Sequence, residues 1–187
     1  GVDITPMGDD SSTWTLAAIL VLLACSAFFS ASETAYSSVN QIRLKSRADN
    51  GDATAQRVLS LAKRYDNLLS TILIGNNVVN IALTSLATVF FTTQISAVYG
   101  ASLSTIVCTV VVLIFGEITP KSLAKEMPER VAIAVSPVLE ALVTIFTPIN
   151  FLFGAWKNFL AKRFHTGESN DGITDAELVT MVNEAEN

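Results

Sequence analysis

The sequence carries little charge, and the charge it has is unevenly placed. Only 16% of its 187 residues are Asp, Glu, Lys or Arg, while 50% are hydrophobic and the net charge is −5. Between Asp66 and Lys121 the only charged residue is Glu117. The negative balance argues against nucleic-acid binding, and the gathering of apolar residues in blocks indicates an integral membrane protein.

Histidine and cysteine are also scarce, with one His and two Cys in the chain. Cys25 and Cys108 lie apart inside apolar blocks, and His165 lies outside them. These residues offer no zinc or copper site and no disulfide framework. The chain has no nucleophile paired with a base, no phosphate-binding glycine loop and no histidine pair, so we expect no enzyme.

Four apolar blocks organise the chain, at residues 13–37, 68–91, 101–120 and 131–155. The first three are long enough to cross about 30 Å of hydrocarbon as helices. The fourth contains Pro137, Glu140 and Pro148, which predicts a broken helix pair that is re-entrant or lies at the membrane surface. The predicted fold is therefore an all-α integral membrane domain over 13–155, with three transmembrane helices and further juxtamembrane helices at 38–66 and 131–155.

The twelve Lys and Arg residues lie in three groups, within 43–64, 121–130 and 157–163. By the positive-inside rule these segments are cytoplasmic, which places residues 1–12 and 92–100 outside the cell. We expect a multi-pass protein of the plasma (inner) membrane with an outer N-terminus and a cytoplasmic C-terminus. The basic stretch 40–67 reads as helical on both sides of Asn50 and Gly51, and either lies on anionic headgroups or forms a solvated loop.

Each predicted span carries one oxygen-rich face. Such residues often hold membrane helices together, but their similar depth, nearer the cytoplasmic ends, favours a shared cation site that opens inward. The faces comprise Ser26, Ser30, Glu33 and Ser37 in the first span, Ser70, Asn76, Asn77, Asn80 and Thr84 in the second, and Gly116 and Glu117 in the third.

Glu117 is the most informative of these residues, because a carboxylate inside an apolar span is costly unless a cation meets it. Pro120 has no N–H, so in an α-helix the carbonyl of Gly116 would lack its donor. A bare carbonyl beside a carboxylate suits a hard cation. The alternative is a structural ion pair between Glu117 and Lys121 or the basic loop. Hydroxyl, amide, carbonyl and carboxylate oxygens together suit Mg²⁺, Ca²⁺, Mn²⁺ or Na⁺.

Three stretches resemble the CorC/CNNM family of magnesium transporters: residues 26–35 (SAFFSASETA), 71–80 (TILIGNNVVN) and 115–121 (FGEITPK). The resemblance implies a homodimer that transports Mg²⁺, in many members by Na⁺-coupled export through alternating access. It implies Mg²⁺ ligands on all three spans, with Glu33, Thr84, Pro120 and Lys121 as candidates for gating or for Na⁺. The implied ligands are Ser26, Ser30, Ser70 or Thr71, Asn76 with its neighbours Asn77 and Asn80, Gly116 and Glu117.

Family members usually continue into CBS nucleotide-binding modules, whereas the sequence here stops at Asn187. The segment 156–187 contains a capping-box pattern from Thr174 to Glu177 and is expected to be a cytoplasmic helical connector, truncated before such modules. Any response to ATP would reside in those modules. Two other functions remain open: a membrane-anchored divalent-cation sensor or scaffold without transport, and, less in keeping with three weakly charged spans, a pore-forming protein.

Overall fold

The structure is a computed structural model that describes residues 9–149, 156 and 159. Within these residues every regular element is a helix, which confirms the predicted all-α class. The elements are α1 (Asp9–Ser38), α2 (Gln41–Asp49), α3 (Ala53–Lys63), α4 (Tyr65–Gln94), α5 (Gly100–Val111), the π-helix η1 (Val112–Ile118), α6 (Thr119–Glu126) and α7 (Pro128–Ile145).

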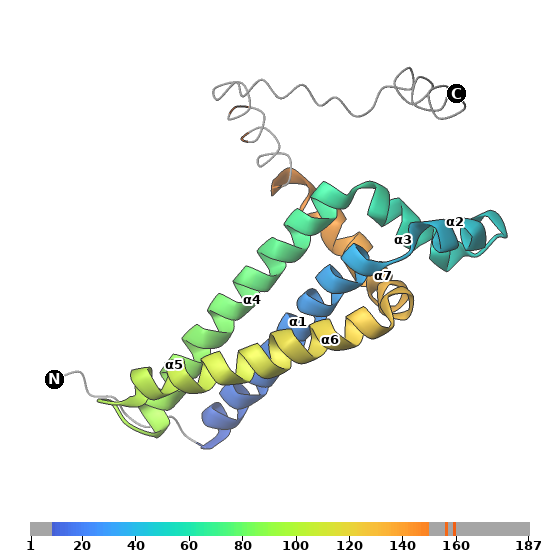
Figure 1. Ribbon diagram of the computed structural model, residues 1–187. Coiled ribbons are helices and arrows are strands. Elements are labelled where there is room, and N and C mark those ends of the chain that lie inside the picture. The colour runs from blue at the N-terminus through green and yellow to red at the C-terminus, as the bar shows by residue number, and fades with distance from the viewer. Residues whose placement is uncertain (1–8, 150–155, 157–158, 160–187) are drawn as a thin grey trace, which may run out of the picture. The chain divides into compact units, whose positions relative to one another are not determined.

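Three helices of the described chain are long and apolar enough to cross a membrane: Ser11–Ser38, Tyr65–Gln94 and Gly100–Glu126. They coincide with the three predicted spans. The third is a continuous rod built from α5, η1 and α6 (Figure 1). The chain is therefore a membrane domain with three spanning helices.

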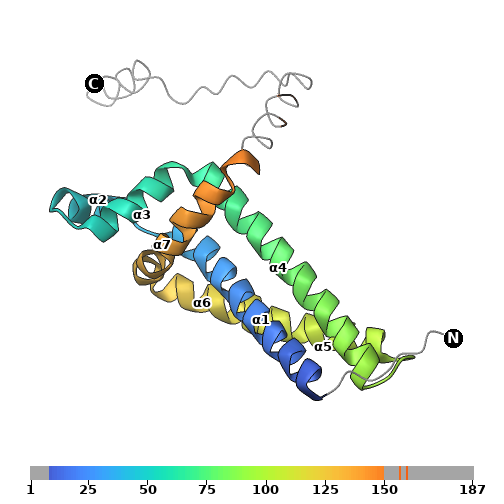
Figure 2. The same cartoon turned by 180° about the vertical axis from the view of Figure 1, so that it is seen from behind.

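The first span, α1, lies between the other two and contacts α4, η1, α6 and α7. α4 and the α5–η1–α6 rod lie close together at the loop that connects them and then diverge, one on each side of α1 (Figures 1 and 2). α1 and α4 run in opposite directions. Inside this pair, a Cβ on Gly75 would lie 2.3 Å from the ring of Phe29. Glycine at this position therefore lets the ring pack directly on the α4 backbone.

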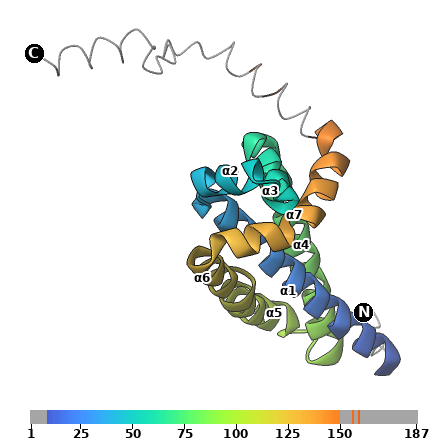
Figure 3. The same cartoon turned by 90° about the vertical axis from the view of Figure 1, so that its right-hand side faces the viewer.

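The segment 41–63 forms two short helices, as predicted, with the turn at Asn50 and Gly51 between them. Asp52 caps α3 by accepting hydrogen bonds from the amides of Thr54 and Ala55. α3 packs against α7 (Figure 3). Two ion pairs join these helices to α7: Arg43 to Glu129 at 3.2 Å and Arg57 to Glu140 at 3.1 Å.

In the fourth apolar block the predicted break does not fall at Pro137, because α7 continues through this residue as one helix. α7 ends at Ile145, with Phe146 as its C-cap, and a further helical turn follows at residues 147–149. Proline removes the N–H that would donate to the carbonyl four residues earlier, which belongs to Ile133. The hydroxyl of Ser136 donates to that carbonyl at 2.9 Å instead. Since the carbonyl keeps a donor, the helix does not need to break there.

The predicted connector 156–187 and the end of the fourth block, 150–155, lie outside the described residues apart from Trp156 and Phe159. The domain limits proposed for this part of the chain remain predictions.

Candidate cation site between α1, α4 and η1

The centre of the candidate site is a contact between the first two spans. The Ser26 hydroxyl is fully buried and donates to Asn76 Oδ1 at 3.4 Å. Ser26 belongs to a series of polar residues on α1 that recur at helical spacing and therefore lie on one face of the helix. Asn76 follows Gly75, where α4 approaches α1 closely. The two predicted ligands therefore meet.

The third span joins the same contact through Gly116. A Cβ built on Gly116 would lie 3.0 Å from Ser26 Oγ and 3.4 Å from Ser26 Cβ. A side chain at this position would crowd the serine, whereas glycine allows the η1 backbone to approach it. Ser26, Asn76 and Gly116 thus bring all three spans together, as the stripes on the three helices predict.

The π-helix changes which carbonyls are available. The Thr119 amide donates to Ile114 O, five residues earlier. α-Helical bonding resumes in α6, where Ile118 is the N-cap and its carbonyl accepts the first α-helical hydrogen bond. The carbonyls of residues 115–117 lie between these two bonds. Only the Lys121 amide remains to donate to them, because Pro120 has no N–H. At most one backbone donor therefore serves the carbonyls of residues 115–117. From the sequence, with α-helical bonding assumed, only the Gly116 carbonyl was expected to lack a donor. The π-helix extends this shortage of donors to the carbonyls of the two neighbouring residues.

Two buried oxygens beside the central contact have no hydrogen-bond partner within the described residues: Ser30 Oγ and Asn80 Oδ1. Ser30 is one turn from Ser26 on α1, and Asn80 is one turn from Asn76 on α4. Because the helices are antiparallel, these oxygens lie on opposite sides of the contact, about 6 Å from it along the helix axes. Unsatisfied buried oxygens are uncommon in folded proteins and are candidates for an absent ligand.

Glu117 follows Gly116 in η1 and is half-buried. Among the described residues no cationic side chain pairs with it: Lys121 Nζ lies 3.1 Å from Glu33 Oε2 instead. The Glu117–Lys121 ion pair considered from sequence is therefore not formed. The Glu33–Lys121 pair itself was missed, because nothing local in the sequence signals a contact across 88 positions.

The remaining second-span candidates are placed differently. Thr71 is buried and donates to Asn67 O at 2.8 Å, one turn back in its own helix. Asn77 and Thr84 are exposed, and each donates to a carbonyl of α4. The structure does not bring these two to the Ser26 contact, and Ser70 is half-buried near the start of α4. The roles of Ser70, Thr71 and Asn77 as ligands, and of Thr84 in gating or Na⁺ binding, stay predictions.

The oxygen atoms that could bind a metal ion at the site belong to hydroxyls, amides, backbone carbonyls and one carboxylate. In the described part of the chain no three His, Cys, Asp or Glu side chains gather as a metal cluster. The set as a whole fits a hard cation, for which such oxygens are the usual ligands.

The chain is similar to several known membrane proteins. Residues 17–187 match the model of the cyclin M (CNNM) transmembrane N-terminal domain. The chain is 36% identical to the UPF0053 inner membrane protein YfjD of Escherichia coli K12 over 86% of its own length and 38% of that protein. It is 35% identical to a UPF0053 protein of Haemophilus influenzae over 89% of its own length and 40% of the relative.

More distant relatives include the polyamine export protein of Escherichia coli K12, which is 28% identical over 88% of this chain and 40% of that protein. The chain spans about two fifths of the length of these relatives. The family match begins within the first span and covers the rest of it, the other two spans and the residues of the candidate site. The chain therefore belongs to the family defined by the cyclin M transmembrane N-terminal domain.

Proposed function

We propose that this membrane domain transports Mg²⁺, binding the ion between α1, α4 and η1 and releasing it on the other side by alternating access. The observation that carries the proposal is the convergence of all three spans on one set of oxygens, two of which are buried without a partner. Because these two oxygens lie on opposite sides of the contact, a single divalent cation would bind one of them, Ser30 Oγ on the side of Glu117, together with the carbonyls of 115–117. Glu117 would supply the compensating charge.

Na⁺-coupled export of Mg²⁺ from the cytoplasm is part of the same proposal. Glu33, considered as a Na⁺ ligand or gating residue, has its carboxylate engaged by Lys121. A second cation at Glu33 would have to displace the ammonium group. The pair therefore supports a gating role for Glu33 and Lys121 more directly than a permanent Na⁺ site.

Two other functions fit some of the observations. A divalent-cation sensor or scaffold would use the same oxygens but move no ion. Export of an organic polyamine, the role that some relatives are named for, would call for several carboxylates spaced along the path. In the described spans Glu117 is the one such carboxylate without a cationic partner near the Ser26 contact, which favours a single compact cation.

The test uses the whole chain, in detergent for binding and in proteoliposomes for flux. Wild-type protein should show a rise in melting temperature with Mg²⁺ and should carry Mg²⁺ across the membrane. Glu117→Gln should abolish both, because it removes the charge while keeping the size of the side chain. Glu126→Gln, at the exposed end of α6, should retain both.

Each outcome separates the candidates. Retention of Mg²⁺ stabilisation and flux in Glu117→Gln would contradict the site. Binding without flux in wild type would favour the sensor or scaffold. Stabilisation by spermidine and not by Mg²⁺ would favour polyamine export.

A further inference from the structure

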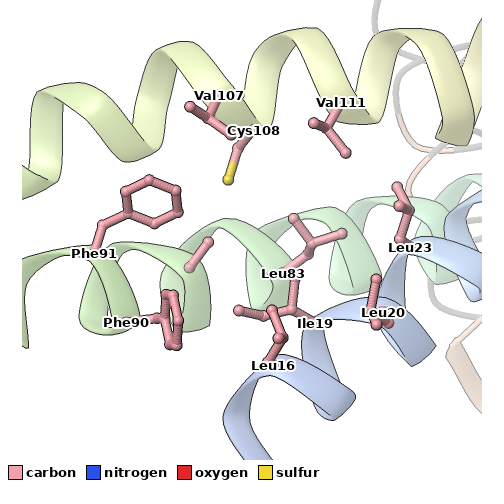
Figure 4. A pocket seen from close by; sticks show the side chains of 11 residues that line it. Leu16, Ile19, Leu20, Leu23, Leu83, Phe90, Phe91, Val107, Cys108 and Val111 are labelled. Carbon is pink, nitrogen blue, oxygen red and sulfur yellow. The ribbon is translucent and has the colours of Figure 1, made fainter. Parts of the chain in front are cut away.

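An apolar cavity of about 250 Å³ lies between α1, α4 and α5. Its walls are formed by residues within 16–23 of α1, 83–91 of α4 and 107–111 of α5. Side chains from all three helices, including Leu83 and the Sγ of Cys108, point into the space between them (Figure 4). All of the lining side chains are aliphatic, aromatic or cysteine, so the cavity has no strong polar partner for water.

The cavity lies next to the candidate cation site but does not include it. Leu23 is three residues before Ser26, and Leu83 is three residues after Asn80. On the third span, the wall ends at Val111, where η1 begins. The cavity therefore starts about one helical turn beyond the oxygens, toward the ends of the spans remote from the basic segments.

In a bilayer the cavity lies at the level of the lipid acyl chains. Trp14 and Tyr99, which flank it along the chain, are 76% and 73% exposed, as aromatic residues at the headgroup level of a membrane usually are. Residues 16–23 rise about 10 Å along the helix, in the direction in which an acyl chain runs. Val21 and Val110, beside the cavity on α1 and α5, are exposed apolar side chains that contact the surrounding lipid in a bilayer.

We propose that this cavity binds one acyl chain of a membrane lipid, from the leaflet remote from the basic segments. A void of this size leaves its lining without dispersion contacts on one side, and a linear hydrocarbon chain would restore them without needing a hydrogen bond. Lipid is the one apolar molecule always present at the cavity in a membrane. The proposal does not depend on which cation the neighbouring site binds.

Photolabelling tests the proposal on the full chain in liposomes, with a phospholipid that carries a diazirine at the end of one acyl chain. Peptide mass spectrometry should find saturable labelling at the cavity residues Leu83, Ala87 and Cys108. The exposed residues Ile81 and Ile106, on the outer faces of the same two spans, should label in linear proportion to the probe. Labelling that follows exposure alone would overturn the proposal.

A filling variant supplies the matched control. Ala87→Leu adds three carbons to the cavity and should reduce labelling at Leu83 and Cys108 to the level of the exposed sites. Ala101→Leu, exposed on α5 and outside the cavity, should leave it unchanged. Unreduced labelling in Ala87→Leu would contradict an acyl chain, as would cavity residues that cross-link to a second copy of the chain instead of to lipid.

If Ala87→Leu fails to fold, the native cysteines give an independent measurement. In a Cys25→Ser chain in detergent, added phospholipid should slow the reaction of Cys108 with N-ethylmaleimide. In a Cys108→Ser chain, Cys25, which does not line the cavity, should react at a rate independent of lipid. A Cys108 rate that does not respond to phospholipid would overturn the proposal.

Discussion

Lys121 Nζ lies 3.1 Å from Glu33 Oε2, so the ammonium group pairs across two spans although Glu117 is only four positions earlier on its own span. Glu and Lys at this spacing commonly pair within an α-helix. The intervening π-helix alters the turn between them, and the pair forms between α1 and α6 instead. The two carboxylates of the site region therefore differ: one is neutralised and the other is available to a cation.

Glu33→Gln should weaken Mg²⁺ binding by about fivefold, or ~1 kcal/mol. The substitution releases Lys121, which can then move toward Glu117 and compete with the ion. The double variant with Lys121→Met should restore the affinity, because it removes the competing charge. Titration of the Mg²⁺-dependent melting temperature gives both values.

The Arg57–Glu140 pair is a matched control, since it has the same 3.1 Å separation and similar exposure but joins α3 to α7. Glu140→Gln should leave Mg²⁺ affinity unchanged. An equal loss in Glu140→Gln and Glu33→Gln would show that the effect is one of general stability and not of charge near the site.

Ser30 and Ser32 make a second matched comparison, because both are fully buried on α1 but only Ser32 has a hydrogen bond, to Phe28 O at 2.7 Å. Removing an unsatisfied hydroxyl costs little, so Ser30→Ala should change the ion-free melting temperature by about 2 °C or less. It should nevertheless lose most of the stabilisation by Mg²⁺. Ser32→Ala should retain that stabilisation, and identical behaviour of the two variants would argue against Ser30 as a ligand.

Ser136→Ala should destabilise α7 by about 1–2 kcal/mol, because it leaves the Ile133 carbonyl without a donor. In a Pro137→Ala background the same substitution should be nearly neutral, since the amide of residue 137 then supplies the donor. Thermal unfolding of the four chains in detergent measures the coupling. Additive effects would show that the serine does not compensate for the proline.

The charge of Asp52 should stabilise the α2–α3 segment in a pH-dependent way. Hydrogen bonds from the Thr54 hydroxyl and the Ala55 amide, followed by those from Arg47, lower the pKa of Asp52 well below its usual value. A depressed folded-state pKa gives stability that is complete above the ordinary aspartate pKa of about 3.9 and is lost as the pH falls below it.

Asp52→Asn should therefore be less stable than wild type at neutral pH, and the two melting curves should converge as the pH is lowered from 5 toward 3. Asn keeps the capping oxygen, so the difference reports mainly on the charge. Asp49→Asn, an exposed neighbour at the end of α2, controls for net charge. A difference that stayed constant with pH would contradict this assignment.

Much of the fold could be predicted from the sequence, because membrane spans are set by length and hydropathy alone. Part of the site could be predicted as well. Helical spacing placed Ser26 and Asn76 on the polar faces of their helices, and in the structure these two residues are in contact. The spacing was too coarse to separate Asn76 from Asn77. The two are adjacent within one predicted arc, but about 100° apart around the helix, and Asn77 is exposed.

Other features depended on contacts that no local pattern reports. Pro137 predicted a break, yet one hydroxyl at Ser136 was enough to keep α7 continuous. Pro120 did signal irregular bonding near Gly116, but whether the helix would adopt i→i+5 bonding depends on how tightly η1 packs against Ser26. The Glu33–Lys121 pair follows from the same packing.

The π-helix also constrains the length of the chain. Its wider turn holds about one residue more than an α-helical turn, so α5 and α6 are out of α-helical phase on its two sides. Deleting a single residue within Val112–Ile118 would allow a continuous α-helix and would leave the later residues facing much as they do now, because the wider turn has absorbed the extra residue. Lys121 would still face Glu33, but the carbonyls of residues 115–117 would lose the π-helical bonding that leaves them short of donors. The exposed side chains of Leu113 and Ile114 can vary in kind, but the number of residues in this stretch cannot change if those carbonyls are to stay available.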